Sequence, residues 1–134
     1  MAERNLGRLI ANLAPRLDPT PWVFTTVAEA PSDVAPLMVF REDEGITCVV
    51  PPEIGGRLGA ADAPVFRRIV LEVHSSLEAV GLTAAVATAL TEAGISANVV
   101  AAFHHDHVFV PADRADEAMT CLRELSSRPR TGPT

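Results

Sequence analysis

The chain has 134 residues, a hydrophobic share of 48% and a formal net charge of −6. That length suits one compact unit or two closely packed half-domains, and the hydrophobic share is too high for a disordered chain. The negative charge argues against a nucleic-acid partner, because phosphates attract a basic surface. Charges among the leucines of residues 1–13 argue against a signal peptide, and no stretch reads as a membrane span of about 20 apolar residues. We therefore expect a cytoplasmic protein with no membrane or nucleic-acid partner.

The first half of the chain predicts a helix, a strand and a hairpin. Apolar residues recur at the spacing of one helix face in the N-terminal segment, residues 1–16, and Pro15 disfavours a helical conformation in the residue before it. Residues 22–27 are rich in β-forming side chains and predict a strand. Two apolar runs flank the turn at residues 43–45, where Gly45 can supply a positive φ, so this segment predicts a β-hairpin.

The second half begins with a strand and a helix. Residues 65–74 alternate between the two faces of a predicted strand. Ser76 offers a hydroxyl as the N-cap of a helix over residues 77–93, and Gly94 is the expected residue after its end. The polar residues of this helix point in scattered directions, which predicts that more than its own sheet covers it. The other half or a second subunit would provide that cover.

Two further strands and a helix follow. Residues 95–103 and 107–110 predict an antiparallel pair joined by the polar connection 104–106. Asp113 opens a helix with one apolar stripe, and residues 127–134 form a tail rich in proline and glycine. The predicted order of the second half is strand, helix, strand, strand and helix, with the helices on one face of a mostly antiparallel sheet. This is the ferredoxin-like plan of the α+β class.

Two runs of the second half resemble the ACT domain. Residues 74–85 read HSSLEAVGLTAA, and residues 93–100 read AGISANVV. With the segment 105–111, they resemble more narrowly an uncharacterised bacterial family of small tandem ACT-domain proteins. The resemblance implies two ferredoxin-like ACT halves of the βαββαβ type, at residues 17–62 and 63–126.

ACT domains are regulatory modules, usually paired, that bind amino acids or similar metabolites where two domains meet. In the aspartate-kinase type, the loop and first helical turn after the first strand present backbone amides to the ligand, and a polar residue at the next strand holds the ligand's amino group. The resemblance thus implies a regulatory sensor that catalyses nothing, needs no cofactor, and acts as a homodimer or on a partner protein. The ligand-binding residues that it implies are Ser76, Leu77, Glu78, Val80, Gly81, Leu82 and Asn98.

Two features of this region have a second interpretation. Gly81 could serve close packing between helix and sheet instead of ligand binding. The helix surface around Leu82, Val86 and Leu90 could pack on a partner subunit, which would make the chain a dimerisation module that binds no ligand.

The segment from His104 to His107 carries a more distant alternative, a metal-dependent enzyme. Imidazole and carboxylate groups are ligands for zinc and other transition metals, and His105, Asp106 and His107 would supply them. Neighbouring residues of a strand point to opposite faces, however, so only His105 and His107 could share a face. A polar connection within a hairpin is the favoured interpretation, and we predict no metal site.

Overall fold

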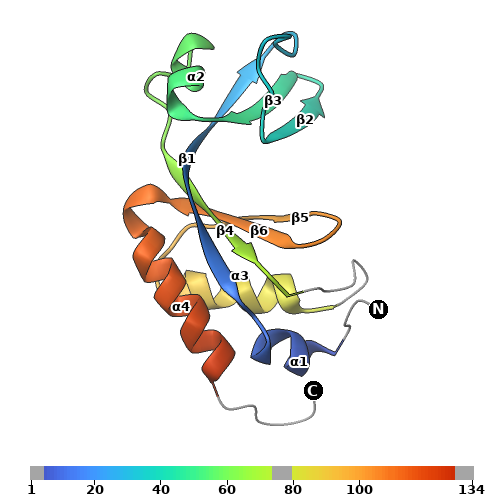
Figure 1. Ribbon diagram of the computed structural model, residues 1–134, viewed down its shortest axis with the longest axis vertical. Helices are drawn as coiled ribbons and strands as arrows, with labels where there is room; N and C mark the ends of the chain where they lie inside the picture. Colours follow the sequence, from blue (N-terminus) through green and yellow to red (C-terminus); the bar gives the residue numbers. More distant parts are fainter. Residues whose placement is uncertain (1–4, 74–79, 129–134) are drawn as a thin grey trace. The chain divides into compact units, whose positions relative to one another are not determined.

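The computed structural model describes residues 5–73 and 80–128 of the chain. Its helices and strands, coloured along the sequence in Figure 1, are α1 (Leu6–Ala11), β1 (Pro15–Val27), β2 (Met38–Glu42), β3 (Gly45–Val50), α2 (Pro52–Arg57), β4 (Phe66–Leu71), α3 (Leu82–Glu92), β5 (Asn98–Ala101), β6 (Asp106–Pro111), the 3₁₀ turn η1 (Ala112–Arg114) and α4 (Ala115–Ser127). None of the helices in these described ranges is long and apolar enough to cross a membrane.

The chain forms two compact units. Unit 1 takes its described residues from Met1–Asp18 and Arg67–Thr134, and unit 2 is Pro19–Phe66. The N-terminal helix therefore belongs to the same unit as the second half of the sequence. Strand β1 contributes its first four residues to unit 1 and the rest to unit 2.

Unit 1 has the predicted ferredoxin-like plan. Its strands are ordered β1-β4-β6-β5, and helices α1, α3 and α4 lie on one side of them (Figure 1). Strands β5 and β6 pair in antiparallel register, with Asn98 opposite Phe109 and Ala101 opposite Asp106. The core joins the sheet to all three helices, and each large apolar side chain removed from water contributes about 1.5–3 kcal/mol. The apolar stripe predicted for the last helix is confirmed, because Ala115, Ala118, Met119, Leu122 and Leu125 are all buried.

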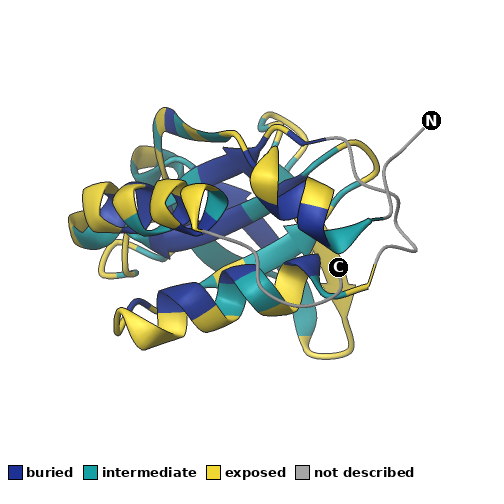
Figure 2. Ribbon diagram, turned by 90° about the horizontal axis from the view of Figure 1, so that it is seen from below, coloured by how far each residue is buried: buried dark blue, intermediate teal, exposed yellow. Residues whose placement is uncertain are grey.

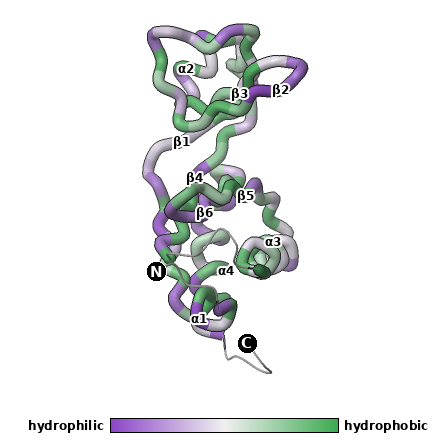
Figure 3. The backbone as a smooth tube through the Cα atoms, turned by 90° about the vertical axis from the view of Figure 1, so that its right-hand side faces the viewer, coloured by the Kyte–Doolittle hydropathy of each residue, from purple (hydrophilic) through white to green (hydrophobic). Residues whose placement is uncertain are grey.

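Unit 2 is a small antiparallel sheet with one short helix. Its strand order is β2-β3-β1, and the predicted hairpin is confirmed, since Glu42 pairs with Gly45 around a two-residue turn that Figure 3 shows as hydrophilic. Val23, Cys48 and Val50 form the core of this unit. A Cβ on Gly55 of α2 would lie 2.4 Å from the Val23 side chain, so only glycine lets this helix approach the sheet so closely.

Helix α3 differs from its prediction in where it starts and in what covers it. It begins at Leu82 instead of residue 77, because Gly81 adopts a left-handed conformation, with φ +98°, which does not fit inside an α-helix. The N-cap predicted at Ser76 lies outside the described residues. The expected cover from the other half or from a second subunit is not needed, because α1 and α4 of the same unit pack beside α3. The buried residues of α3 lie on one side of the helix and its exposed residues, which include the three threonines, on the other; Figure 2 colours the ribbon by this burial.

The strands also differ in extent. Strand β1 starts at Pro15 instead of residue 22, and β5 ends at Ala101 instead of residue 103. Phe103 and His104 form the turn to β6 instead of a connection that begins at His104. A proline at the start of a strand needs no ladder hydrogen bond from its own nitrogen, which explains why Pro15 begins one here.

Candidate functional site

Among residues 5–73 and 80–128, no side chain caps the backbone donors at the start of α3. Gly81 is the N-cap residue and has no side chain to accept a hydrogen bond, while its carbonyl accepts the amide of Ala85 at 2.8 Å. The first amides of an α-helix have no partner within the helix, so those of Leu82, Thr83 and Ala84 point out of its end. Aligned peptide dipoles add partial positive charge there. This arrangement suits a carboxylate or a phosphate group.

The backbone at Gly81 explains why this residue is glycine. Its φ of +98° is strained for any residue that has a side chain. A Cβ at this position would also lie 3.0 Å from a methyl group of Leu6 in α1. Close packing therefore accounts for Gly81, although the contact is with α1 and not with the sheet.

The predicted ligand residues fall into three groups. Ser76, Leu77 and Glu78 lie outside the described residues. Val80 is 83% exposed immediately before the uncapped helix end, whereas the side chain of Leu82 is 3% exposed in the core. Asn98 is exposed, and because its neighbours Ala97 and Val99 pack on the helix-side core, it lies on the opposite face of the sheet. Leu82 thus lies in the core as a whole residue, and the exposed residues of the first turn are Thr83 and Ala84.

The surface predicted for a partner subunit belongs to the interior of unit 1. Leu82, Val86 and Leu90 are all part of the core that α3 shares with the sheet. Val86 and Leu90 are completely buried. The prediction that this surface docks a second subunit is wrong, because a residue cannot serve both the core of its own unit and an interface.

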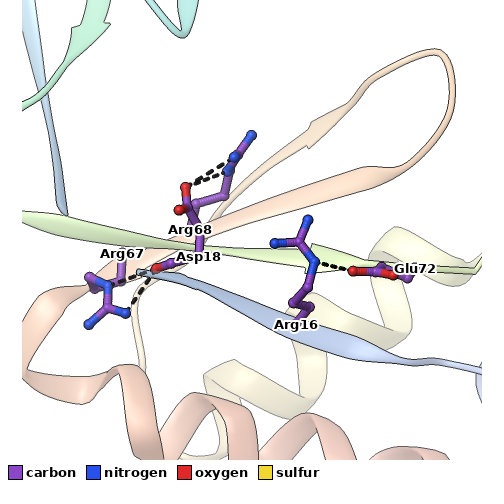
Figure 4. A network of polar contacts seen from close by, with 5 residues as sticks. All are labelled: Arg16, Asp18, Arg67, Arg68 and Glu72. Atoms are coloured by element: carbon purple, nitrogen blue, oxygen red, sulfur yellow. Dashed lines mark hydrogen bonds and ion pairs between the residues drawn. The ribbon is translucent and has the colours of Figure 1, made fainter. Parts of the chain in front are cut away.

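A polar network that was not predicted links β1 to β4 (Figure 4). Two nitrogens of Arg68 lie 3.0 Å from the same carboxylate oxygen of Asp18, and Arg67 donates two hydrogen bonds to the main-chain carbonyl of Asp18 at 2.9 and 3.1 Å. Arg16 forms an ion pair with Glu72 further along the same two strands. The alternation of polar residues along β4 was evident from the sequence. The partners on β1 were not, because the sequence predicts a strand there only from residue 22.

The histidine segment forms the end of the β5–β6 hairpin. Asp106 is buried, which raises the pKa of its carboxyl group, while His105 opposes that shift. Burial lowers the pKa of His107, and the nearby positive charges of Arg68, His105 and Arg16 lower it further. The Nδ1 atoms of His105 and His107 are buried and have no hydrogen-bond partner. Over residues 5–73 and 80–128, no three histidine, cysteine or acidic side chains come together as metal ligands.

Two surface hollows lie away from these groups. One, of about 650 Å³, belongs to unit 2 and is lined by Phe24, Thr25, Thr26, Glu42, Thr47, Leu58, Gly59 and Ala60. The other, of about 420 Å³, lies beside α4 and the C-cap residue Ala93 of α3, and three of its six lining residues are acidic. Neither is lined by a predicted ligand residue, and neither contains a cluster of groups suited to catalysis.

Comparison with known proteins gives one consistent result. Residues 1–67 and residues 67–124 each match the ACT domain. A crystal structure from Vibrio cholerae, of a protein of unknown function described as a possible transport protein, is 45% identical with a TM-score of 0.77. The match covers 87% of this chain and 92% of that one. No curated protein matches the chain.

More distant structures share the fold alone. A protein from Agrobacterium tumefaciens is 16% identical with a TM-score of 0.68, over 85% of this chain and 89% of that one. The ligand-free regulatory subunit of aspartate kinase from Thermus thermophilus is 11% identical with a TM-score of 0.63, over 85% of this chain and 98% of that one.

Proposed function

Because the chain belongs to the ACT-domain family, with two consecutive ACT domains, we propose that it is a regulatory module that binds an amino acid and catalyses no reaction. The observation that carries the proposal is the uncapped start of α3, directly after the exposed Val80. The carboxylate of the amino acid accepts hydrogen bonds from the amides of Leu82, Thr83 and Ala84.

The remaining ligand contacts follow the family resemblance. Ser76, Leu77, Glu78, Val80 and Gly81 precede the helix in the sequence and are proposed as further contacts of the ligand. Asn98 is not proposed as the partner of the amino group, because it lies on the face of the sheet opposite the helices. Since the side chain of Leu82 is buried, its part in the proposal is limited to its amide. The protein acts in the cytoplasm, as a homodimer or through a partner protein whose activity the bound amino acid changes.

A thermal-shift screen of the standard amino acids at millimolar concentration tests the proposal. A ligand present at 100 times its dissociation constant stabilises the folded state by about 2.7 kcal/mol, so a true ligand raises the melting temperature by several degrees. If no amino acid raises it, the proposed function is wrong.

A charge placed at the helix start locates the site. Ala84 and Thr88 are both exposed on α3, the first in its opening turn and the second in its middle. Ala84→Glu leaves the helix intact, because a negative charge suits that end, but it opposes a bound carboxylate. We expect Ala84→Glu to weaken binding by at least about fivefold, the equivalent of roughly 1 kcal/mol, and the matched control Thr88→Glu to leave it unchanged. Equal effects of the two variants would place the ligand elsewhere.

A further inference from the structure

One face of the sheet of unit 1 carries arginine and imidazole groups, together with the carboxylates of Asp18 and Glu72, which pair with the arginines. Leu17, Ile69 and Val108 pack into the core on the helix side. Because side chains alternate along a strand, Arg16, Arg68 and His107 therefore lie on the opposite face, on three strands that are neighbours in the sheet. His105 lies just before β6 begins, two residues from His107, and its charge acts on His107. We call these four residues the histidine–arginine cluster.

The two imidazoles of the cluster lack partners that a buried polar atom requires. Nδ1 of His105 and Nδ1 of His107 are both shielded from water and unbonded among the described residues. A neutral imidazole has one donor and one acceptor nitrogen, and leaving either unsatisfied in the interior is costly. The charges that act on His107 come from Arg68, His105 and Arg16 and are all positive. The positive charges beside His107 disfavour a cationic donor as the missing partner and favour an anionic acceptor, which takes the imidazole N–H.

The arginine nearest to solvent can be released for a ligand. The Arg16 and Glu72 side chains are 55% and 41% exposed, and ion pairs between exposed groups contribute little to stability. Arg68 is different, because it holds the nearly buried carboxylate of Asp18. An anion can thus displace Glu72 from Arg16 at small cost while the pair of Arg68 and Asp18 stays in place.

We propose that the histidine–arginine cluster is a second ligand site, which binds a small oxyanion, the carboxylate or phosphate group of a metabolite. The anion accepts hydrogen bonds from His105 and His107 and takes Arg16 in place of Glu72. This site lies on the sheet face away from α3 and does not depend on the amino-acid site proposed above.

NMR of the histidine side chains tests this directly. Inorganic phosphate and acetate are titrated separately into the full chain at constant ionic strength, and the imidazole resonances are followed. We expect saturable shifts of His105 and His107, whereas His104, which lies exposed in the turn, serves as the internal control. Saturation by phosphate alone identifies a phosphate site, and saturation by acetate alone identifies a carboxylate site. Absence of saturation with both anions, or equal shifts of all three histidines, would overturn the proposal.

Variants separate an anion site from a purely structural ion-pair network. Glu72→Gln removes the competing carboxylate and should tighten anion binding by about two- to fivefold, whereas Glu124→Gln, an exposed acid on α4, should leave it unchanged. His107→Gln should weaken binding by about tenfold, and His104→Gln should not. A structural network would show none of these changes in affinity. Ala84→Glu leaves this site intact, so failure of the amino-acid site does not affect the result.

Discussion

Replacing Arg68 by methionine should destabilise unit 1 more than any other change at an ion pair in the described part of the chain. The Asp18 side chain is 9% exposed and that of Arg68 is 20% exposed. The substitution therefore leaves the carboxylate of Asp18 nearly buried and without its charged partner. Removing one partner of a buried pair costs about 3–5 kcal/mol. Because Arg68 retains some exposure, we expect about 3 kcal/mol, which corresponds to a fall of roughly 10 °C in melting temperature.

Chemical denaturation of a double-mutant cycle measures this effect. Asp18→Asn combined with Arg68→Met removes both charges, so the double variant should be more stable than Arg68→Met alone, with a coupling energy of about 1–3 kcal/mol. The control is Arg57→Met, which breaks the exposed pair with Asp33 and should leave stability unchanged. Equal losses in Arg68→Met and Arg57→Met, or strictly additive losses in the cycle, would refute the reasoning.

Three further predictions concern stability. Gly81→Ala should cost at least about 1–2 kcal/mol in a denaturant melt, because the residue is left-handed and lies against α1, whereas Gly56→Ala, with open space around an added Cβ, should be neutral or stabilising by up to about 1 kcal/mol. Leu90→Ala should cost about 2–5 kcal/mol, since this core residue is completely buried, and a smaller loss would place α3 outside the core. The unfolded chain protonates His107 near its ordinary pKa of 6.5 but the folded chain only at lower pH, so stability should fall as the pH drops below about 6.5. His107→Gln should flatten that decline, and identical pH profiles would contradict the pKa shift.

The spacing of side chains was enough to predict several elements of both units. The apolar stripe of the last helix, the alternation along β4 and the hairpin at Gly45 each follow from the spacing of side chains, and each is present. The start of α3 was not predictable in this way. A serine pair before an apolar run signals the start of a helix more strongly than a glycine inside the run, so the prediction began the helix at residue 77. The left-handed conformation of Gly81 depends on packing against Leu6, which lies far away in the sequence.

The histidine–arginine cluster could not be located from sequence for a similar reason. Pro15 was taken as the end of a helix, although it begins β1, so nothing indicated that Arg16 pairs with Glu72. The residue types were visible, but the strand register that gathers them on one face depends on pairing between distant segments. Of the candidate amino-acid site, the resemblance to the ACT domain suggested the segment before α3, of which residues 74–79 lie outside the described residues. Which amides begin the helix depended on where α3 starts.

Backbone amide NMR during titration with an amino acid is the most direct test of the central claim. The amino acid that raises the melting temperature most is added to the ¹⁵N-labelled full chain. We predict saturable downfield shifts, as expected for new hydrogen bonds, at the amides of Leu82, Thr83 and Ala84, at the uncapped start of α3. Saturable shifts confined to other parts of the chain, with these three amides unmoved, would contradict the account.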